Sequence, residues 1–138
     1  MIAIFDIDGV LADATHRQHH LLSRPKDWDA FFGAVGDDPV LEHGRERLMA
    51  LAVDNDVVLL SGRPERTRAD TVAWLERQGI AVSRLVLRPD ADHRPAAALK
   101  AELVRGIGTP DQVTVVVDDD ESILDRLAAM GYSTELFG

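Results

Sequence analysis

Cysteine is absent from the 138 residues of the sequence. This absence excludes disulfide bonds, thiolate zinc sites and cysteine nucleophiles, and it is typical of a reducing compartment. No apolar run approaches the roughly 20 residues that a membrane-spanning helix requires. The N-terminus also lacks the basic start and the long apolar stretch of a signal peptide. The sequence therefore predicts a cytoplasmic protein that has no membrane partner.

Basic residues are the minority among the charges, with 15 lysines and arginines against 24 aspartates and glutamates. The net charge of −9 argues against a broad nucleic-acid groove, although it leaves room for a local basic pocket. A glycine-rich loop ending in Gly-Lys-Ser/Thr is missing, so a P-loop kinase is not indicated. The length and the 46% hydrophobic content fit one globular domain, which we predict to span residues 1–138.

Strand-like and helix-like stretches alternate along the chain. Short apolar runs predict strands at Met1–Phe5, Val57–Leu60, Arg84–Leu87, Val113–Val117 and Ser133–Phe137. Helical patterns between them predict helices at Glu42–Val53, Glu65–Gln78, Pro95–Val104 and Glu121–Met130. This alternation is typical of an α/β fold whose parallel sheet is covered on both faces. Residues 13–41 break the pattern and predict a short loop and helix insert over the carboxyl edge of the sheet.

Two aspartates, Asp6 and Asp8, follow directly after the first predicted strand, and Gly9 comes next. Carboxylates are rarely buried without a partner. The carboxyl ends of the strands are also where an open α/β sheet binds its ligands. This short run therefore predicts a site for a metal, a phosphate, or both.

Further polar residues are expected at the same edge of the sheet. Ser61, Gly62 and Arg63 follow the second predicted strand, and the Asp118–Asp120 run follows the fourth. Lys100 lies on the helix between the third and fourth strands. Carboxylates are suited to attack phosphorus and to hold Mg²⁺, whereas a lysine and backbone N–H groups stabilise phosphate oxygens. The set indicates phosphoryl transfer.

Four motifs in this order resemble the haloacid dehalogenase (HAD) superfamily of Mg²⁺-dependent phosphohydrolases: FDIDGVLAD, LLSGR, the region of Lys100, and VVDDDES. The 3′-phosphatase domain of phage polynucleotide kinase is the subtype that the chain resembles best. The resemblance implies a HAD-like Rossmannoid three-layer sandwich with a minimal cap or none. It also implies Mg²⁺ as the cofactor and a phosphorylated partner, either a nucleic-acid end or a small molecule.

The resemblance further implies a role for individual residues. Asp6 would be the nucleophile and a metal ligand, and Asp8 the general acid and base whose backbone carbonyl is a further ligand. Ser61 would bind the transferring phosphate, and Lys100 would pair with Asp6 and the phosphate. Asp118 and Asp119 would complete the metal site, without a decision on which one touches the metal.

Substrate contacts are expected from Gly62 and Arg63, and from either Arg17 or Arg24, between which the spacing does not decide. Asp120 is expected to cap the helix that follows it. In the insert, three histidines at helical spacing (His16, His19 and His20) suggest zinc, but no fourth ligand is evident. The aromatic residues Trp28, Phe31 and Phe32 fit packing of the insert better than stacking on a nucleobase.

The leading hypothesis is a Mg²⁺-dependent phosphomonoesterase that acts through an aspartyl-phosphate, with polynucleotide 3′-phosphate ends as one candidate substrate. A phosphatase for a small phosphorylated metabolite or nucleotide is the first alternative, which the acidic net charge favours. A receiver-like phospho-accepting signalling domain is a weaker one. A receiver would carry its acidic pair after the first strand and its phospho-accepting aspartate after the third, and this order is not found here.

Overall fold

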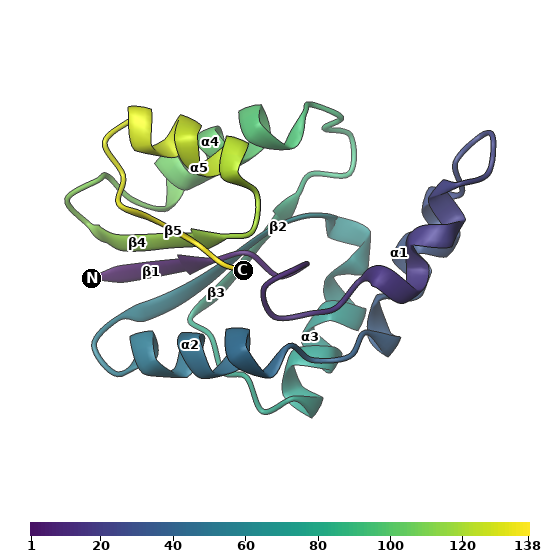
Figure 1. The fold of residues 1–138 in the computed structure, drawn as a ribbon, viewed down its shortest axis with the longest axis horizontal. Coiled ribbons are helices and arrows are strands. Elements are labelled where there is room, and N and C mark those ends of the chain that lie inside the picture. The colour runs from purple at the N-terminus through teal and green to yellow at the C-terminus, as the bar shows by residue number, and fades with distance from the viewer.

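Five parallel strands form one sheet at the centre of the computed structural model, which describes all 138 residues (Figure 1). The strands are β1 (Ile2–Phe5), β2 (Asp56–Pro64), β3 (Arg84–Arg88), β4 (Val113–Asp118) and β5 (Thr134–Leu136). Their order in the sheet is β3-β2-β1-β4-β5, so β1 lies in the middle. The chain adds β2 and β3 on one side of β1 and then crosses over to add β4 and β5 on the other side. This switch in strand order opens a crevice at the carboxyl ends of the strands. The predicted α/β fold is confirmed.

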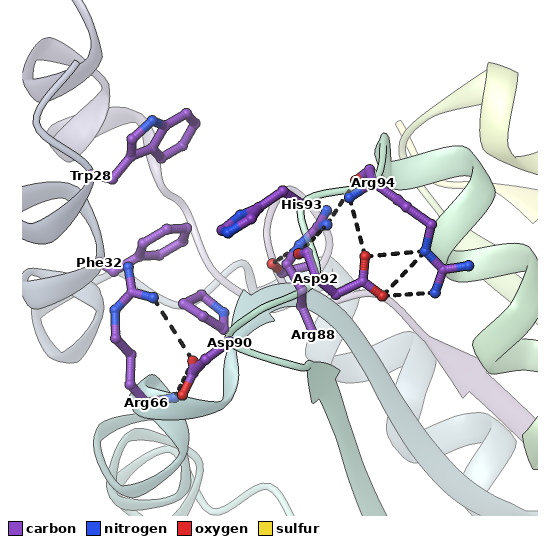
Figure 2. A pocket seen from close by; sticks show the side chains of 10 residues that line it. Trp28, Phe32, Arg66, Arg88, Asp90, Asp92, His93 and Arg94 are labelled. Atoms are coloured by element: carbon purple, nitrogen blue, oxygen red, sulfur yellow. Dashed lines mark hydrogen bonds and ion pairs between the residues drawn. The ribbon is translucent and has the colours of Figure 1, made fainter. Parts of the chain in front are cut away.

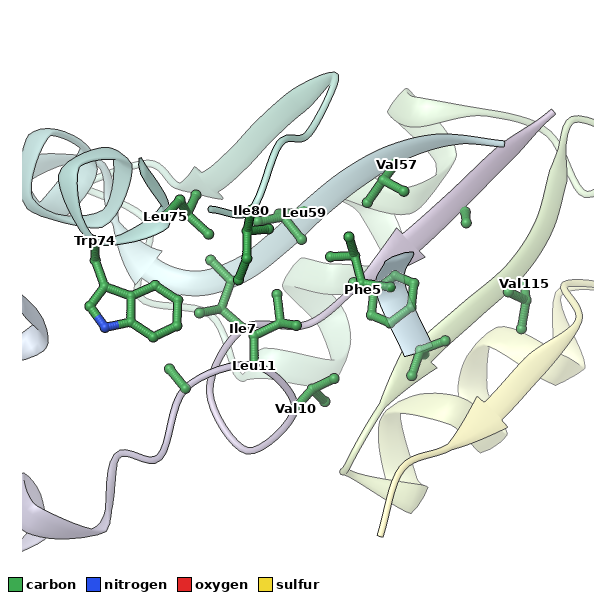
Figure 3. Packing of buried hydrophobic residues seen from close by; sticks show 14 residues of the cluster. Phe5, Ile7, Val10, Leu11, Val57, Leu59, Trp74, Leu75, Ile80 and Val115 are labelled. Atoms are coloured by element: carbon green, nitrogen blue, oxygen red, sulfur yellow. The ribbon is translucent and has the colours of Figure 1, made fainter. Parts of the chain in front are cut away.

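Helices cover both faces of the sheet, as the continuous apolar strands predict. Four helices do so: α2 (Glu42–Ala52), α3 (Arg68–Arg77), α4 (Ala96–Ile107) and α5 (Glu121–Ala129). Figure 1 shows α2 and α3 on one side and α4 and α5 on the other. Each side has its own apolar core, one around Leu48, Trp74 and Leu75 and one around Val104 and Leu124. Figure 3 shows the first core, in which Phe5 at the end of β1 and Ile7 just after it lie in one cluster with Trp74 and Leu75 of α3.

The two ends of the insert at residues 13–41 lie side by side, next to the chain that follows β1. The Asp13 backbone N–H donates to the Pro39 carbonyl at 2.8 Å, and the Leu41 N–H donates to the Leu11 carbonyl at 2.8 Å. Between these points lie a 3₁₀ helix (Thr15–Leu21), α1 (Trp28–Gly33) and a second 3₁₀ turn (Val35–Asp37). Figure 1 shows this segment standing beyond the carboxyl ends of the strands.

The second strand extends further than predicted. β2 continues through Ser61 to Pro64 because, after a register shift between these two residues, Pro64 still pairs with Arg88 of β3. Ser61 therefore lies within the strand and does not cap a helix. The predicted helix at 65–78 begins as a 3₁₀ turn (Glu65–Thr67) and becomes α3 only at Arg68. No helix has both the length and the apolar character needed to span a bilayer.

Gly44 in α2 is required by the close packing of this helix on the chain after β1. A Cβ atom at position 44 would lie 1.7 Å from the Val10 carbonyl oxygen, which is backbone and has no rotamer with which to move away. We expect Gly44→Ala to lower the free energy of unfolding by at least about 2 kcal/mol, because the helix must move outward. Gly106→Ala in α4 is the matched control, since nothing lies within 4 Å of its Cβ position.

Urea unfolding of both variants measures this difference. The control should be neutral or slightly more stable, because alanine favours the helix by roughly 0.5–1 kcal/mol over glycine. Equal stabilities for the two variants would contradict the close approach of α2 to Val10.

Candidate active site

The first cluster of polar side chains lies where β1 and β4 end. Phe5 pairs with Val117 in the sheet, so the next residues, Asp6 and Asp118, come side by side at the carboxyl edge. Lys100 reaches them from α4, with its Nζ 3.0 Å from Asp6 Oδ1 and 2.7 Å from Asp118 Oδ2. All three side chains are buried. The sheet register and one helix therefore assemble a buried carboxylate pair with a shared cation.

Burial controls the electrostatics of this cluster. It raises the pKa of Asp6 well above its usual value, and Lys100 offsets only part of that effect. Burial alone would lower the pKa of Lys100, but the negative charges of Asp6 and Asp118 outweigh it and raise that pKa. Lys100 is therefore charged across the physiological pH range. One lysine faces two carboxylates, so the cluster still lacks positive charge.

Asp119 brings a third carboxylate to the same place. Oxygen atoms of Asp6, Asp118 and Asp119 lie within 4.8 Å of one another. Gly9 makes room for this, because a Cβ at position 9 would lie 1.9 Å from Asp119 Oδ2, and its φ of +85° also favours glycine. Three hard oxygen donors with one shared cation fit Mg²⁺, which binds a few carboxylates together with water and phosphate. The carboxylate of Asp8 is not part of this group.

Asp8 instead faces two arginines. Its Oδ1 accepts hydrogen bonds from Arg17 Nη2 at 2.8 Å and from Arg63 Nη2 at 2.8 Å. Burial would raise the pKa of Asp8, but Arg63 and then Arg17 outweigh it and lower that pKa. The carboxylate of Asp8 is therefore ionised in the free protein.

Asp38 holds the two arginines, and no motif in the sequence singles it out. Its carboxylate is fully buried and accepts from Arg17 Nε at 2.8 Å, Arg17 Nη2 at 2.8 Å and Arg63 Nη2 at 3.0 Å. His16 Nε2 lies 2.6 Å from Asp38 Oδ1, and Trp74 Nε1 donates to the Asp38 carbonyl at 2.7 Å. The histidine thus makes a polar contact within this network. Asp38 is the buried counter-charge that fixes the arginine pair.

Arg17 retains one unused donor. Its Nη1 is the one buried side-chain nitrogen or oxygen that has no hydrogen-bond partner. The guanidinium also lies over the Phe31 ring, 4.5 Å from the ring centroid. A buried N–H without a partner costs free energy, and a bound anion would satisfy it. Arg24 was the alternative to Arg17, but it is exposed and forms no ion pair. Of these two candidates, the structure brings only Arg17 to Asp8.

Ser61 and Gly62 lie on β2 next to these residues. Ser61 is buried, and its hydroxyl oxygen accepts the Arg63 backbone N–H at 3.1 Å, which leaves the hydroxyl proton free to donate to a phosphate. Asp120 is the expected cap, since its side chain accepts from the backbone N–H groups of Ser122 and Ile123.

Removing the charge of Asp119 tests the carboxylate cluster. Partial desolvation and the charge of Asp118 raise the pKa of Asp119, although the residue is exposed, so its ionised form opposes folding in the absence of metal. That cost is complete above the folded-state pKa and disappears as pH falls below the unfolded-state pKa. We expect Asp119→Asn to raise the Tm by a few degrees at neutral pH in EDTA, and to lose most of the Tm increase that Mg²⁺ gives the wild type.

Asp125→Asn, on the exposed face of α5, is the matched control and should follow the wild type in both buffers. A lower Tm in EDTA together with an unchanged response to Mg²⁺ would contradict the repulsive cluster.

A family model described as the polynucleotide kinase PNKP phosphatase domain matches residues 1–134. No curated protein matches the chain. Among solved structures, a chain of the Pnkp1/Rnl/Hen1 complex superposes with a TM-score of 0.81 at 24% identity. That alignment covers 99% of this chain and 45% of the other, so the chain spans less than half the length of that relative.

Two further solved structures are similar in fold. The class C acid phosphatase of Bacillus anthracis with tungstate bound has a TM-score of 0.66 at 17% identity, over 99% of this chain and 65% of that one. A HAD family enzyme of Bacteroides thetaiotaomicron in complex with magnesium and inorganic phosphate has a TM-score of 0.61 at 13% identity, over 99% and 93%. At these identities the structural matches establish the fold alone.

Proposed function

The chain belongs to the family of PNKP-type polynucleotide kinase phosphatase domains and is a phosphatase, and we propose that it hydrolyses phosphomonoesters through an aspartyl-phosphate on Asp6. One observation carries the proposal. Asp6 lies beside Lys100 at the carboxyl edge of the sheet, and Asp8, two residues on, provides a second carboxylate. A nucleophile needs this second group to protonate the leaving alcohol and to activate water.

In the first half-reaction, an Asp6 carboxylate oxygen attacks phosphorus and forms an acyl-phosphate bond. The bond from phosphorus to the ester oxygen breaks, and Asp8, which takes up a proton from solvent when the phosphate binds, donates that proton to the departing alkoxide. In the second half-reaction, Asp8 takes a proton from water as the water oxygen attacks the same phosphorus. Inorganic phosphate leaves, and Asp6 returns as a carboxylate.

Positive charge balances the phosphate oxygens during both steps. Lys100 stabilises negative charge at Asp6, while the Ser61 hydroxyl and the Gly62 backbone N–H bind phosphate oxygens. Asp6, Asp118 and Asp119 would hold Mg²⁺, together with the Asp8 backbone carbonyl. When bound, the ion would supply a Lewis acid that polarises a phosphate oxygen and reduces repulsion between the phosphate and the nucleophile.

The two arginines that contact Asp8 link substrate binding to the protonation of Asp8. In the free protein they keep Asp8 ionised, which is the form that the second half-reaction requires. The charge of a phosphate bound beside Asp8 opposes that ionisation, so substrate binding favours the protonated form that the first half-reaction requires. Arg17 and Arg63, both buried in the free protein, are proposed to orient Asp8 and to lie next to the substrate phosphate.

The proposed substrate is the 3′-phosphate end of a polynucleotide. The insert at residues 13–41 is too short to form the cap domain that would enclose a small metabolite, so a bulky phosphate has access. The family match supports a nucleic-acid end, and so does the likeness to a chain of the Pnkp1/Rnl/Hen1 complex, which is described as an RNA repair complex. The net charge of −9 supports the second candidate, a small phosphorylated metabolite or nucleotide.

Phosphate release tests the two candidates directly. The panel contains a 3′-phosphate oligonucleotide, a 5′-phosphate oligonucleotide, mononucleotides and sugar phosphates, each with Mg²⁺ and with EDTA. Asp6→Asn serves as the blank. We expect the highest kcat/KM on the 3′-phosphate oligonucleotide, and a preference for a sugar phosphate would contradict the proposed substrate while leaving the chemistry intact.

A further inference from the structure

A groove of about 480 Å³ opens beside the active site, between α1 of the insert and the loop that joins β3 to α4 (Figure 2). Gly62 is one of its lining residues. Because Gly62 also separates Ser61 from Arg63, the groove begins at the strand that is proposed to bind the phosphate. Whatever is attached to that phosphate has this groove next to it.

One wall of the groove is aromatic. The Trp28 and Phe32 rings are stacked, with centroids 5.8 Å apart and planes 19° apart, and Phe31 packs edge-on against both. Trp28 is nevertheless 46% exposed, although an indole is normally among the more buried side chains. The packing holds an exposed aromatic surface in a fixed orientation, which lowers the entropy cost of stacking a ligand on it.

The opposite wall is formed by His93. Its side chain is exposed and makes no hydrogen bond or ion pair. Figure 2 shows the imidazole pointing across the groove toward Trp28 and Phe32. A planar ring that enters between the walls would meet the aromatic pair on one side and the imidazole on the other.

Arg88, which also lines the groove, carries a positive charge that forms no ion pair. Its Nε donates to the Gly62 carbonyl at 3.1 Å, and its Nη1 donates to the Asp92 and Arg94 carbonyls at 3.0 and 2.7 Å. No carboxylate lies within ion-pair distance of Arg88, whereas the other two arginines of the groove do have acidic partners. Arg66 is 3.8 Å from Asp90, and Arg94 is 2.7 Å from Asp92.

This charge pattern fits a single nucleotide better than a long polyanion. A surface that follows a nucleic-acid backbone needs a row of unpaired basic groups. Here two of the three lining arginines are paired with carboxylates. The remaining features are a stacking surface and two separate cations without an ion pair, Arg88 and Lys26, whose Nζ lies 5.7 Å from the Trp28 ring centroid. The same pattern reconciles a nucleic-acid end as substrate with the acidic net charge of the chain.

We propose that this groove binds the nucleobase of the nucleotide that carries the scissile phosphate, stacked on Trp28 and Phe32 and facing His93. The inference rests on the proposed function and deepens it, since it identifies the part of the substrate that is recognised beside the phosphate. Stacking accepts any base, so the groove selects a nucleotide end without selecting its sequence.

Turnover of base-bearing and abasic substrates tests the stacking. Two 3′-phosphate oligonucleotides are compared, one with a normal terminal nucleotide and one in which that nucleotide lacks its base. For the normal substrate, Trp28→Ala is expected to lower kcat/KM by roughly 5- to 150-fold, the range for loss of one stacked base. For the abasic substrate, the same variant should have the activity of the wild type.

Two control variants separate stacking from effects on the insert. Trp28→Phe keeps an aromatic face and should retain most of the activity on the normal substrate. Leu22→Ala removes another exposed apolar side chain of the insert, 80% exposed, and should be neutral on both substrates. An equal loss from Trp28→Ala on the normal and abasic substrates would overturn the proposal, while the phosphatase activity would stand.

Tryptophan fluorescence provides a readout that does not need turnover. The chain has two tryptophans, and Trp74 is only 1% exposed, so quenching by a bound base reports on Trp28. Adenosine 3′-phosphate should quench the fluorescence of Asp6→Asn protein, and neither ribose phosphate nor inorganic phosphate should do so. If adenosine 3′-phosphate quenches the fluorescence of Asp6→Asn but the wild type does not hydrolyse the oligonucleotide, the proposed substrate is refuted and base binding in the groove stands. If adenosine 3′-phosphate causes no quenching, base binding in the groove is refuted.

Discussion

Asp6→Asn is expected to reduce phosphatase activity by on the order of 10⁴-fold or more, while the fold is retained. The amide has the shape of the carboxylate but cannot act as the nucleophile toward phosphorus. Stability should not fall, because burial already penalises the ionised form of Asp6, and Lys100 keeps Asp118 as a partner. Phosphate release and thermal unfolding, measured on the same preparation, check the two parts of this expectation.

Asp125→Asn is the matched control, since it makes the same chemical change on an exposed part of α5. It should leave activity and Tm unchanged. Substantial turnover by Asp6→Asn, in a preparation free of wild-type protein and deamidated product, would show that another group attacks the phosphate.

Asp38→Asn is expected to lower the free energy of unfolding by about 3 kcal/mol or more. The substitution leaves two buried arginines, Arg17 and Arg63, with Asp8 as their only carboxylate partner. The arginines should then lose their fixed orientation, so kcat/KM should fall as well although Asp38 does not touch the reacting atoms. Urea unfolding and steady-state kinetics measure the two effects.

Asp37→Asn is the control for this change, because Asp37 is the exposed neighbour and its side chain makes no hydrogen bond. Its stability should stay within about 0.5 kcal/mol of the wild type. A similarly small effect for Asp38→Asn would mean that the buried network does not hold the arginines in place.

The parts of the molecule that depend on local sequence could be predicted. The order of strands and helices follows from apolar runs separated by helical patterns, because each element has to bury one or both of its faces. Asp6, Lys100 and Asp118 could be expected to meet, since the carboxyl ends of parallel strands share one edge of a sheet. The sheet register places Asp6 beside Asp118, and α4 brings Lys100 within hydrogen-bond distance of both.

The parts that depend on packing of the insert could not be predicted in the same way. Asp38 lies in a Gly-Asp-Asp-Pro run that resembles an ordinary turn, and its partners are 21 and 25 residues away along the chain. The choice between Arg17 and Arg24 needed the position of that carboxylate. The sequence held only an indirect signal for Asp38, because an arginine that is buried beside Asp8 needs a second carboxylate as its counter-charge.

The groove shows the same limit. Trp28 and Phe32 were expected mainly to pack the insert, and the structure places Phe31 in that role while Trp28 stays half exposed. The insert was expected to contain short helices without stated bounds, whereas His93 and Arg88 come from a loop and a strand on the other side of the site. Sequence spacing carries no information about two segments that meet only through the tertiary fold.

The measurement that tests the central claim most directly is capture of the phosphorylated enzyme. A labelled phosphomonoester that the wild type hydrolyses is mixed with excess enzyme, quenched in acid within the first turnover, and reduced with borohydride. An acyl phosphate on Asp6 predicts protein-bound label that hydroxylamine removes, and homoserine at position 6 after reduction. Complete first-turnover hydrolysis with no protein-bound label, or label that persists in Asp6→Asn, would contradict nucleophilic attack by Asp6.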